Sequence, residues 1–322
     1  MTKALVTGGA GFIGTHICDS LLSDGVAVVC FDNLGSGQRG NVNRFEDDDA
    51  YTFVEGDVRE PLGQQLNELD TNFDYIYHFA SRASPADFKD HALEISQTNT
   101  IGTKHVLELA REMDATVVYA STSEVYGDPK EHPQEESYRG NVSIRGPRAP
   151  YDEAKRFGET LCTMYTRQFG VDTRTVRIFN TYGPRMRSDD GRVVPTFCVQ
   201  ALQGDDLTVY GEGDQTRSFL FVDDLVRGVR TFAEHDELAG EVINIGHTDE
   251  TTINEFANTV TRLSPNSIET VYQPLPEDDP TRRRPDITKA KSLLDWEPTI
   301  DLETGLKKTL EYFGTEVVNA HP

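Results

Sequence analysis

A glycine-rich turn, GGAGFIG at residues 8–14, constrains the fold of this chain more strongly than any other feature of the sequence. The turn follows the apolar, β-rich run KALVT (3–7) and precedes residues 12–23, whose apolar side chains recur at helical spacing. Glycines at such a turn let backbone N–H groups approach a pyrophosphate, and the N-terminus of the helix adds positive potential. The glycines concerned are Gly8, Gly11 and Gly14. A strand, a glycine turn and a helix in this order predict a dinucleotide-binding site.

An acidic residue at the end of the next predicted strand indicates which dinucleotide binds. VAVVCF (26–31) is this strand, and Asp32 follows it. The Asp32 carboxylate suits the ribose hydroxyls of NAD and would repel the additional phosphate of NADP. Asn33 comes next rather than an arginine, so NAD is favoured, and Asp57 after the third strand is placed to meet the adenine. The alternative is a glycine turn with an incidental acid.

The first half of the chain alternates short β-rich runs with longer amphipathic runs. This alternation is typical of an α/β fold with a doubly wound parallel sheet of the Rossmann type. Helices are expected around 99–111 and 150–169. The further strand candidates are YTFVE (51–55), YIYHF (75–79), TVVYAS (116–121), TRTVRIF (173–179) and VINIG (242–246).

Beyond Asn180 the pattern loosens into Gly and Pro turns and shorter elements, which predicts a smaller domain over the carboxyl ends of the strands. We expect the dinucleotide-binding domain to comprise residues 1–180 and about 217–246. The smaller, discontinuous substrate-binding domain then comprises residues 181–216 and about 247–322.

Acidic residues outnumber basic ones in this chain of 322 residues, with 54 Asp and Glu against 31 Lys and Arg and a formal net charge of −23. A nucleic-acid binder needs a basic stripe, so the charge argues against nucleic acid as a partner. It also disfavours docking on anionic lipid. Such a surface keeps a protein soluble where salt screens its self-repulsion, so we expect a salt-rich host; the alternative is an ordinary acidic cytosolic enzyme.

Hydropathy and cysteine usage indicate a cytoplasmic protein. No apolar run approaches the ~20 residues of a membrane span, and the N-terminus enters a strand without the pattern of a signal peptide. The four cysteines lie far apart without a CxxC pair, so we expect reduced packing residues. The histidines occur singly, and no metal site is expected.

The pentapeptide YDEAK places Tyr151 and Lys155 on one face of a predicted helix. A free tyrosine has a pKa near 10, too high for a base at neutral pH. A neighbouring ammonium and a positive nicotinamide ring favour the phenolate, so this spacing is expected to lower the pKa of Tyr151. Thr122 follows a predicted strand and adds to the pattern. The alternative is a half-buried helix aromatic beside a lysine that extends to the surface.

Together, GGAGFIG, STSEVYG (121–127) and YDEAK resemble the extended short-chain dehydrogenase/reductase family, whose members act on nucleotide sugars. The resemblance covers essentially the whole chain and is closest for the branch of UDP-glucuronate decarboxylases (UDP-xylose synthases). The stretches that carry it are STSEVYGDP, GPRAPYDEAKRFGETLC, RIFNTYGPRMR, DGRVVPTF, LTVYGEGDQTRSF, LPEDDPTRRRPDITKAK and LLDWEP.

This resemblance implies NAD-dependent conversion of UDP-glucuronate to UDP-xylose through a 4-keto sugar. Tyr151 takes the proton of the C4 hydroxyl with Thr122 in the relay, the 4-keto acid loses CO2, and the sugar is reduced again. Lys155 tunes the tyrosine and holds the nicotinamide ribose. By the same likeness, Glu124 orients the sugar or relays a proton; the alternative is a loop acid that faces solvent.

Ser123 separates this prediction from related reactions. In dTDP-glucose 4,6-dehydratases an aspartate stands at the matching position and acts as the acid for a departing hydroxyl. Serine does not easily protonate a leaving hydroxide, whereas decarboxylation needs no such acid. UDP-sugar 4-epimerases share the Tyr, Lys and Thr but usually lack the Glu before VYG. The open alternatives are a 4,6-dehydratase, a 4-epimerase and a non-catalytic dinucleotide-sensing module; the intact Tyr151, Lys155 and Thr122 argue against the sensor.

The resemblance also implies a wider set of binding residues, and a homodimer paired through the helix of Tyr151 and the helix near 99–111. Expected cofactor contacts are Gly8, Gly11, Phe12, Ile13, Gly14, Asp32, Asn33, Asp57, Val58, Ala80, Asn99, Tyr151 and Lys155. Expected contacts with the UDP-sugar are Ser84, Asn180, Arg185, Arg192, Tyr210 near the uracil, Arg217 and Arg283, with Arg187 as a further candidate. Arginines suit the negative charge of UDP, although any single one has the alternative of a surface ion pair.

The segment HFASRASPADF (78–88) departs from the family pattern, because Arg82 stands where a proline is usual. Two orientations of Arg82 are open, towards the substrate carboxylate or outward to solvent. His78 in the same segment is expected to pack in its strand rather than to take part in catalysis.

Overall fold

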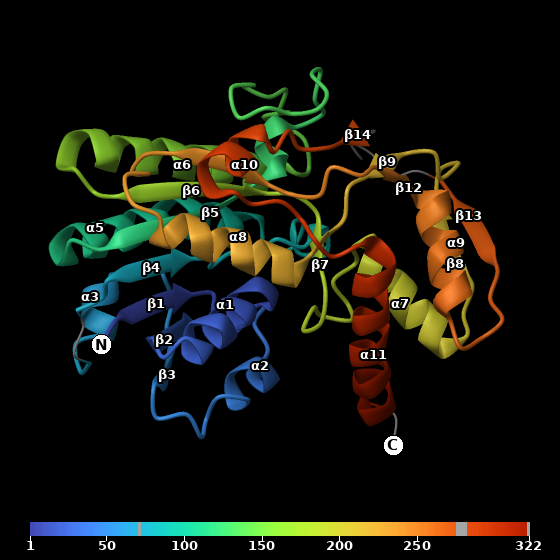
Figure 1. Cartoon of the computed structure of the whole chain (residues 1–322), viewed down its shortest axis with the longest axis horizontal. Coiled ribbons are helices and arrows are strands. Elements are labelled where there is room, and N and C mark those ends of the chain that lie inside the picture. Colours follow the sequence, from blue (N-terminus) through green and yellow to red (C-terminus); the bar gives the residue numbers. More distant parts are fainter. Residues whose placement is uncertain (70–71, 275–281, 321–322) are drawn as a thin grey trace.

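Seven parallel strands form the central sheet of the computed structural model, which describes residues 1–69, 72–274 and 282–320. The strand order is β11-β6-β5-β4-β1-β2-β3, so the chain runs outward from β1 to one edge and then crosses to the other (Figure 1). The strands are β1 (Lys3–Thr7), β2 (Ala27–Asp32), β3 (Tyr51–Glu55), β4 (Tyr75–His78), β5 (Thr116–Thr122), β6 (Thr173–Ile178) and β11 (Val242–Ile245). The α/β, doubly wound fold predicted from the sequence is therefore confirmed.

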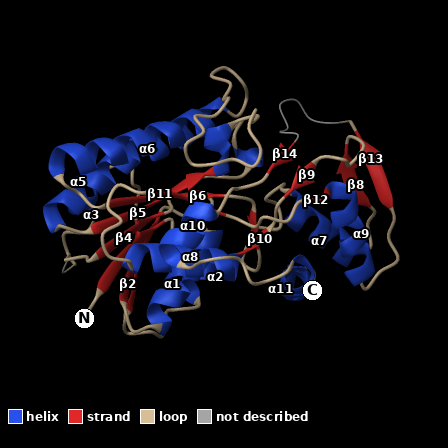
Figure 2. Cartoon of the chain, turned by 45° about the horizontal axis from the view of Figure 1, so that its top comes forward, coloured by secondary structure: helices blue, strands red, loops and turns tan. Residues whose placement is uncertain are grey.

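Successive side chains of each strand point to opposite faces of the sheet, and both faces are covered by helices (Figure 2). Ala4 and Val6 of β1 belong to the hydrophobic core beneath α1 (Phe12–Ser23) and α8 (Val222–Glu234). Leu5 belongs to the core on the other face. The helices of that face are α3 (Leu62–Gln65), α5 (Thr103–Met113) and α6 (Ala149–Phe169). Burial on both faces explains why the strands appear in the sequence as nearly continuous apolar runs.

The helix expected around 99–111 differs in form from the prediction. The segment divides into α4 (Ala92–Gln97), a π-helical turn (Thr98–Gly102) and α5. Within it, the Asn99 amide donates to the carbonyl of Ile95 at 2.9 Å, and the Thr103 hydroxyl donates to the carbonyl of Asn99 at 2.8 Å. Side chains that bond back to carbonyls one turn earlier compete with the regular backbone ladder, which accounts for the widened turn.

Shorter elements gather at the end of the molecule opposite the N-terminus (Figure 1). Two strand groups lie there: the parallel pair β8 (Leu207–Tyr210) and β13 (Thr270–Gln273), and the three-stranded group β12 (Thr251–Thr252), β9 (Thr216–Arg217) and β14 (Arg282–Arg283). The helices beside them are α7 (Val193–Gln203), α9 (Ile253–Leu263) and α11 (Leu302–Ala320). The remaining elements are α2 (Arg39–Asn43), β7 (Thr181–Tyr182), β10 (Leu220–Phe221) and α10 (Thr288–Leu294). The domain boundaries given above stay a prediction.

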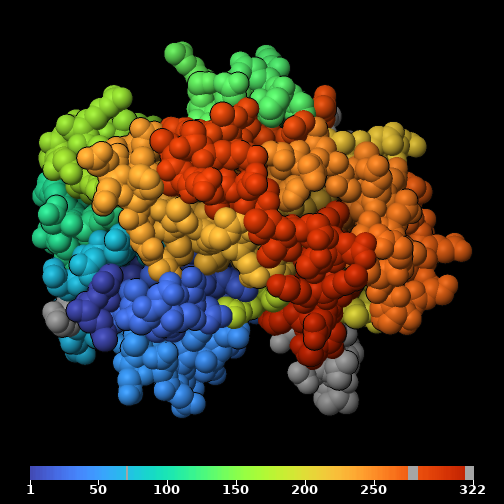
Figure 3. Space-filling view, in the orientation of Figure 1, coloured from blue at the N-terminus to red at the C-terminus, as the bar shows by residue number. Residues whose placement is uncertain are grey.

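The C-terminal segment is fastened to α8 by one buried carboxylate. Asp224 accepts hydrogen bonds of 2.8 Å from the backbone N–H groups of Thr299 and Ile300 and from the Thr299 hydroxyl. The indole of Trp296 donates to the Asp224 carbonyl at 3.0 Å. The red segment in Figure 3 accordingly lies between α8 and the orange elements that include α9. Across residues 1–69, 72–274 and 282–320, none of the helices combines the length and apolarity that a membrane crossing requires.

Candidate active site

A cavity of about 230 Å³ lies at the carboxyl ends of β1, β2, β4, β5 and β6, the edge where parallel sheets place their ligands. Its wall brings together most of the residues that the sequence singled out. The predicted site residues in the wall are Gly8, Gly11, Phe12, Ile13, Gly14, Asp32, Asn33, Asp57, Val58, Ala80, Ser84, Thr122, Ser123, Glu124, Tyr151, Lys155, Asn180, Arg185, Arg187 and Arg192. Asn99, Tyr210, Arg217 and Arg283 do not line it.

The glycine turn forms one end of this cavity and leaves no room for side chains. A Cβ atom added to Gly14 would lie 2.1 Å from the carbonyl oxygen of Gly8. One added to Gly8, whose φ is +75°, would lie 2.6 Å from the backbone nitrogen of Ala80. The helix α1 begins at Phe12, directly after the turn. A pyrophosphate fits this cradle, because backbone can approach it closely and the helix N-terminus offers positive potential.

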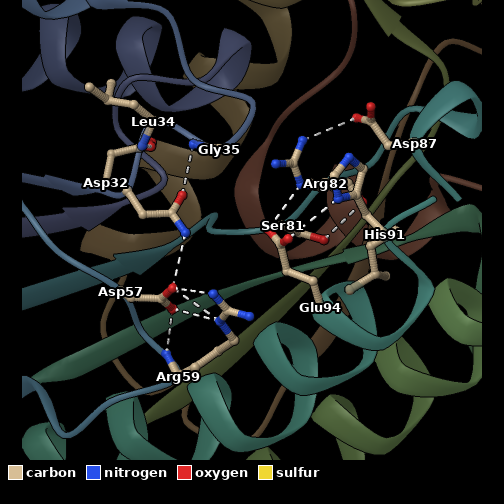
Figure 4. Close-up of polar contacts among 12 residues, drawn as sticks. Asp32, Leu34, Gly35, Asp57, Arg59, Ser81, Arg82, Asp87, His91 and Glu94 are labelled. Atoms are coloured by element: carbon tan, nitrogen blue, oxygen red, sulfur yellow. Dashed lines mark hydrogen bonds and ion pairs between the residues drawn. The ribbon is translucent and has the colours of Figure 1, made fainter.

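Asp32 lies beside the cradle and is held by the backbone. Its carboxylate accepts from the N–H groups of Ala10 at 3.0 Å and Leu34 at 2.7 Å. Figure 4 shows Asp32 beside Leu34. Burial raises the pKa of Asp32, and these two hydrogen bonds oppose that shift. The remaining lone pairs of a buried, oriented carboxylate suit ribose hydroxyls, which fits the predicted role.

Asp57 occupies the expected position but brings a cation that the sequence analysis missed. Arg59 donates to its two oxygens, with Nη2 2.6 Å from Oδ2, and Asn33 Nδ2 lies 3.2 Å from the same oxygen (Figure 4). These contacts, led by the hydrogen bonds from Arg59, lower the pKa of Asp57. The sequence Asp57-Val58-Arg59 was the signal that could have predicted this ion pair, because side chains two residues apart can pair in an extended segment.

Arg82 is part of the cavity wall, so the outward orientation does not occur. Its Nε donates to Glu94 Oε1 at 2.9 Å, and its Nη1 lies 4.0 Å from Asp87 Oδ2 (Figure 4). Asp87 also accepts from Arg187 at 3.2 Å. The positive charge of Arg82 in the cavity wall is therefore already balanced by Asp87 and Glu94, which follow it in the sequence.

Tyr151, Lys155 and Thr122 meet where α6 passes the end of β5. The Lys155 ammonium donates to the carbonyl of Ala120 at 2.6 Å and lies 6.0 Å from the centre of the Tyr151 ring. Burial lowers the pKa of Lys155 to about 7. Burial also raises the pKa of Tyr151 well above its usual value, and a hydrogen bond with Thr122 only partly offsets this effect.

The protein's own side chains therefore do not lower the pKa of Tyr151, and the expected lowering, which included the nicotinamide ring, stays a prediction. Desolvation outweighs the influence of Lys155, because the ring is only 6% exposed and the lysine itself tends to lose its proton. A phenolate at this position needs a further positive charge, such as the nicotinamide ring that the sequence analysis invoked.

Glu124 is buried between two arginines rather than turned to solvent. Arg148 Nη2 lies 2.7 Å from its Oε2, and Arg283 contacts Oε1 while also donating to the carbonyl of Gly127 at 3.0 Å. Burial opposes ionisation, yet Arg283 and Arg148 hold the pKa of Glu124 well below its usual value. Of the two roles implied for Glu124, a fixed anion favours orientation of a ligand over donation of a proton. Arg148, which precedes Tyr151 by three residues, was not identified from the sequence.

The other predicted arginines differ in how they reach the site. Arg192 pairs with the buried Asp190, whose Oδ2 lies 2.8 Å from Nη2. Arg185 contacts Asp19 of α1 and donates to the carbonyl of Thr15 at 3.2 Å, so its guanidinium is committed to that helix. Ser84 donates to the Asp190 carbonyl and caps the turn before Phe88.

Two of the predicted substrate contacts, Tyr210 and Arg217, lie among the shorter elements at the end of the molecule opposite the N-terminus. Tyr210 ends β8 and is 48% exposed, and Arg217 of β9 pairs in register with Arg283 of β14. The part of the motif LPEDDPTRRRPD at 275–281 lies outside the described residues.

Two neighbouring polar residues have structural partners. Asn99 lies beneath the wall and donates to the Ser81 hydroxyl at 2.9 Å. His78 bonds Thr7 Oγ1 at 2.7 Å and Thr103 Oγ1 at 3.1 Å, and burial lowers its pKa to about 3. His78 was predicted to pack in its strand, and its burial confirms this.

Comparison with known proteins identifies the family of this chain. The NAD dependent epimerase/dehydratase family matches residues 4–246. UDP-glucuronic acid decarboxylase 1 of Danio rerio is 47% identical over 315 residues, 98% of this chain and 73% of that protein. UDP-glucuronic acid decarboxylase 6 of Arabidopsis thaliana is 45% identical over 312 residues, 97% of this chain and 88% of that protein. The structure of UDP-glucuronic acid 4-epimerase from Bacillus cereus, in complex with UDP-glucuronic acid and NAD, has a TM-score of 0.88 at 29% identity and covers 98% of this chain and 100% of its own.

The glycine cradle gives a direct test of the dinucleotide site. We expect Gly14→Ala to weaken NAD binding by at least about tenfold, because the new methyl group collides with the Gly8 carbonyl and pushes α1 away from the turn. Titration calorimetry with NAD measures the effect. Gly63→Ala in α3 is the matched control, since an added Cβ there meets open space. Equal affinities of the two variants would contradict the assignment.

Proposed function

The chain belongs to the NAD dependent epimerase/dehydratase family, and from this membership we propose that it decarboxylates UDP-glucuronate to UDP-xylose through a 4-keto intermediate. The observation that carries the proposal is 45–47% identity to UDP-glucuronic acid decarboxylases over 97–98% of this chain, and the residues predicted for the reaction lie in one cavity. Ser123, at the place of a dehydratase acid, also lines this cavity. A 4-epimerase and a 4,6-dehydratase share the fold at lower sequence identity, so they are the less favoured candidates.

The chain's own residues supply binding and proton transfer for this reaction. Gly8, Gly14 and Asp32 would hold NAD, whose chemistry is to accept a hydride from C4 of the sugar and to return it. Tyr151 accepts the proton of the C4 hydroxyl, and Thr122 stabilises the phenol oxygen through its hydrogen bond. Lys155 stays fixed on the Ala120 carbonyl beneath the ring.

Decarboxylation follows from the position of the C4 ketone. The ketone is β to the C6 carboxylate, so the electron pair of the C5–C6 bond passes into the enolate while CO2 leaves. C5 then takes up one proton and the C4 hydroxyl is restored. No hydroxide leaves at any stage, which is consistent with a serine rather than an acid at position 123.

A product assay tests the proposal. Incubation with NAD and UDP-glucuronate should yield UDP-xylose and CO2 in equal amounts, measured by chromatography and trapped CO2. UDP-glucose and dTDP-glucose are the controls, and neither should be consumed at a comparable rate. A 4-keto-6-deoxy sugar from dTDP-glucose, or epimerised UDP-sugar without CO2, would replace the proposal with one of the alternatives.

Tyr151→Phe tests the base. We expect turnover to fall by about 10²–10⁴, the usual contribution of general acid–base catalysis, while the affinity for NAD is retained. Tyr165→Phe on the same helix is the matched control, because its hydroxyl faces Glu108, away from the cavity wall. A near-normal rate in Tyr151→Phe would show that another group takes the proton.

We further propose that two copies pair through α6 and the segment 92–113. Phe157 and Met164, seven residues apart on one face of α6, are 49% and 43% exposed, and Leu93 and Ile101 beside them are 72% and 43% exposed. A patch of this kind is typical of an interface. Phe157→Asp should convert a dimer to a monomer in light scattering, whereas Ile144→Asp in an exposed loop should not. A monomeric parent protein would refute the pairing.

The charge of the chain supports a proposal about its surroundings. With a net charge of −23, we infer a salt-rich cytoplasm, and the four free, buried cysteines are consistent with a reducing compartment. Added KCl screens the self-repulsion and should raise the melting temperature. A melting temperature that stays constant or falls with KCl would contradict this inference.

A further inference from the structure

Asp152 is a buried carboxylate for which the catalytic scheme above has no use. It follows Tyr151 directly in the first turn of α6 and is 5% exposed. Its Oδ1 atom is buried and has no hydrogen-bond partner. Burying an ionised carboxylate without donors is costly, and the protein tolerates this cost one residue from its base.

The charged groups that act on Asp152 come from three elements. Glu124, in the turn after β5, and the adjacent Glu153 repel its negative charge, whereas Arg148 at the start of α6 and Arg283 of β14 attract it. Both arginines make their direct contacts with Glu124. Burial and the Glu124 charge together raise the pKa of Asp152 to about 7.

Glu124, Arg148, Asp152 and Arg283 form a cluster that adjoins the cavity. Arg148 and Glu124 belong to the wall of the cavity. The Arg148 guanidinium lies 5.6 Å from the centre of the Phe88 ring, and that ring stacks on Tyr151 with centres 5.1 Å apart. On the proposed function, the C4 hydroxyl of the sugar meets Tyr151, and the C6 carboxylate is two carbon–carbon bonds away. Arg148 is the cation that a carboxylate on the Phe88 side of Tyr151 would meet in this wall.

Entry of the substrate carboxylate adds negative charge to the groups around Asp152. The cluster of Glu124, Arg148, Asp152 and Arg283 contains two cations and two acids, and the nearby Arg192 is already paired with Asp190. The sugar carboxylate is a third anion for the same two cations. Glu124 is in direct contact with both arginines, which hold its pKa low, whereas Asp152 Oδ1 has no hydrogen-bond partner.

We propose that Asp152 takes up one proton when the sugar carboxylate binds, and so acts as a positioning residue that leaves Arg148 and Arg283 to the two remaining anions. The overall decarboxylation also consumes one proton. Heterolysis of the C5–C6 bond releases neutral CO2 and leaves an electron pair on the sugar, and C5 gains a proton. One proton thus enters the site with the substrate carboxylate, and one leaves in the new C5–H bond. Asp152 returns to its ionised form when the substrate charge is gone.

The test uses NAD-loaded protein in the Tyr151→Phe background, in which nucleotide sugars bind without turnover. Titration calorimetry in buffers of different ionisation enthalpy counts the protons taken up with UDP-glucuronate and with UDP-glucose, which lacks the carboxylate. At pH 8 we expect about one more proton with UDP-glucuronate, and at pH 6 a smaller difference, because Asp152 is then already protonated. Proton uptake that the sugar carboxylate induces at Lys155 instead would persist in the Asp152→Asn variant, which separates the two groups.

The Asp152→Asn variant should abolish this difference. Its affinity for UDP-glucuronate should also become nearly independent of pH, whereas the affinity of the parent protein falls by about tenfold per pH unit above pH 8. Glu153→Gln removes the same charge from the adjacent position; because Glu153 itself repels Asp152, this variant should keep the additional proton uptake, with its pH dependence moved slightly to lower pH. Binding of UDP-glucose and NAD shows that each variant is folded.

Two outcomes would overturn the proposal: no additional proton uptake in the parent protein at pH 8, or additional uptake that persists in Asp152→Asn. The first needs no variant at position 152, so it decides even where the substitution disturbs folding. Failure of the proposed function is a separate result, because it appears as absent CO2 release in the wild-type assay. Wild-type turnover without proton uptake on binding would remove the role of Asp152 alone.

Discussion

Close backbone contact between β1, α1 and the chain after β4 is the constraint on which the site depends. Gly14 lies against the Gly8 carbonyl, and Gly8 lies against Ala80, at distances that no side chain permits. This contact fixes the start of α1 over the end of β1 and brings the segment 79–88 next to the turn. The loops after β2, β5 and β6 end at the same edge because the strands are parallel, so one cavity collects residues from most of the chain.

In that cavity, the arginines that could bind an anion are already paired with acidic side chains of the protein. Arg192 rests on Asp190, Arg82 on Glu94, and Arg148 on Glu124. In a chain with a net charge of −23, such pairing holds each guanidinium in place without leaving a large positive field. The consequence is that an incoming anion competes with resident carboxylates. Binding then requires either displacement of an acid or neutralisation of one, and a buried acid without hydrogen bonds is the easiest to neutralise.

The sequence predicted the parts of this arrangement that depend on local pattern. All seven strands of the sheet were located, because burial on both faces makes them apolar runs, and the spacing of Tyr151 and Lys155 placed both on one helical face. The partners of the arginines were not predictable, since they depend on tertiary neighbours. Arg185 pairs with Asp19, which lies 166 residues away in sequence. The π-helical turn at 98–102 was also missed, because it arises from side-chain bonds to carbonyls that leave the apolar pattern unchanged.

The pKa values of Tyr151 and Lys155 show why burial matters more than spacing at this site. Desolvation raises the pKa of the phenol and lowers that of the ammonium to about 7, so it favours the uncharged form of both groups. A lysine that readily loses its proton cannot by itself hold a phenolate. A cation placed against the pair lowers both pKa values, which favours the ionised phenol and the neutral lysine. Positive charge in the same cavity therefore favours removal of a proton from the sugar by Tyr151.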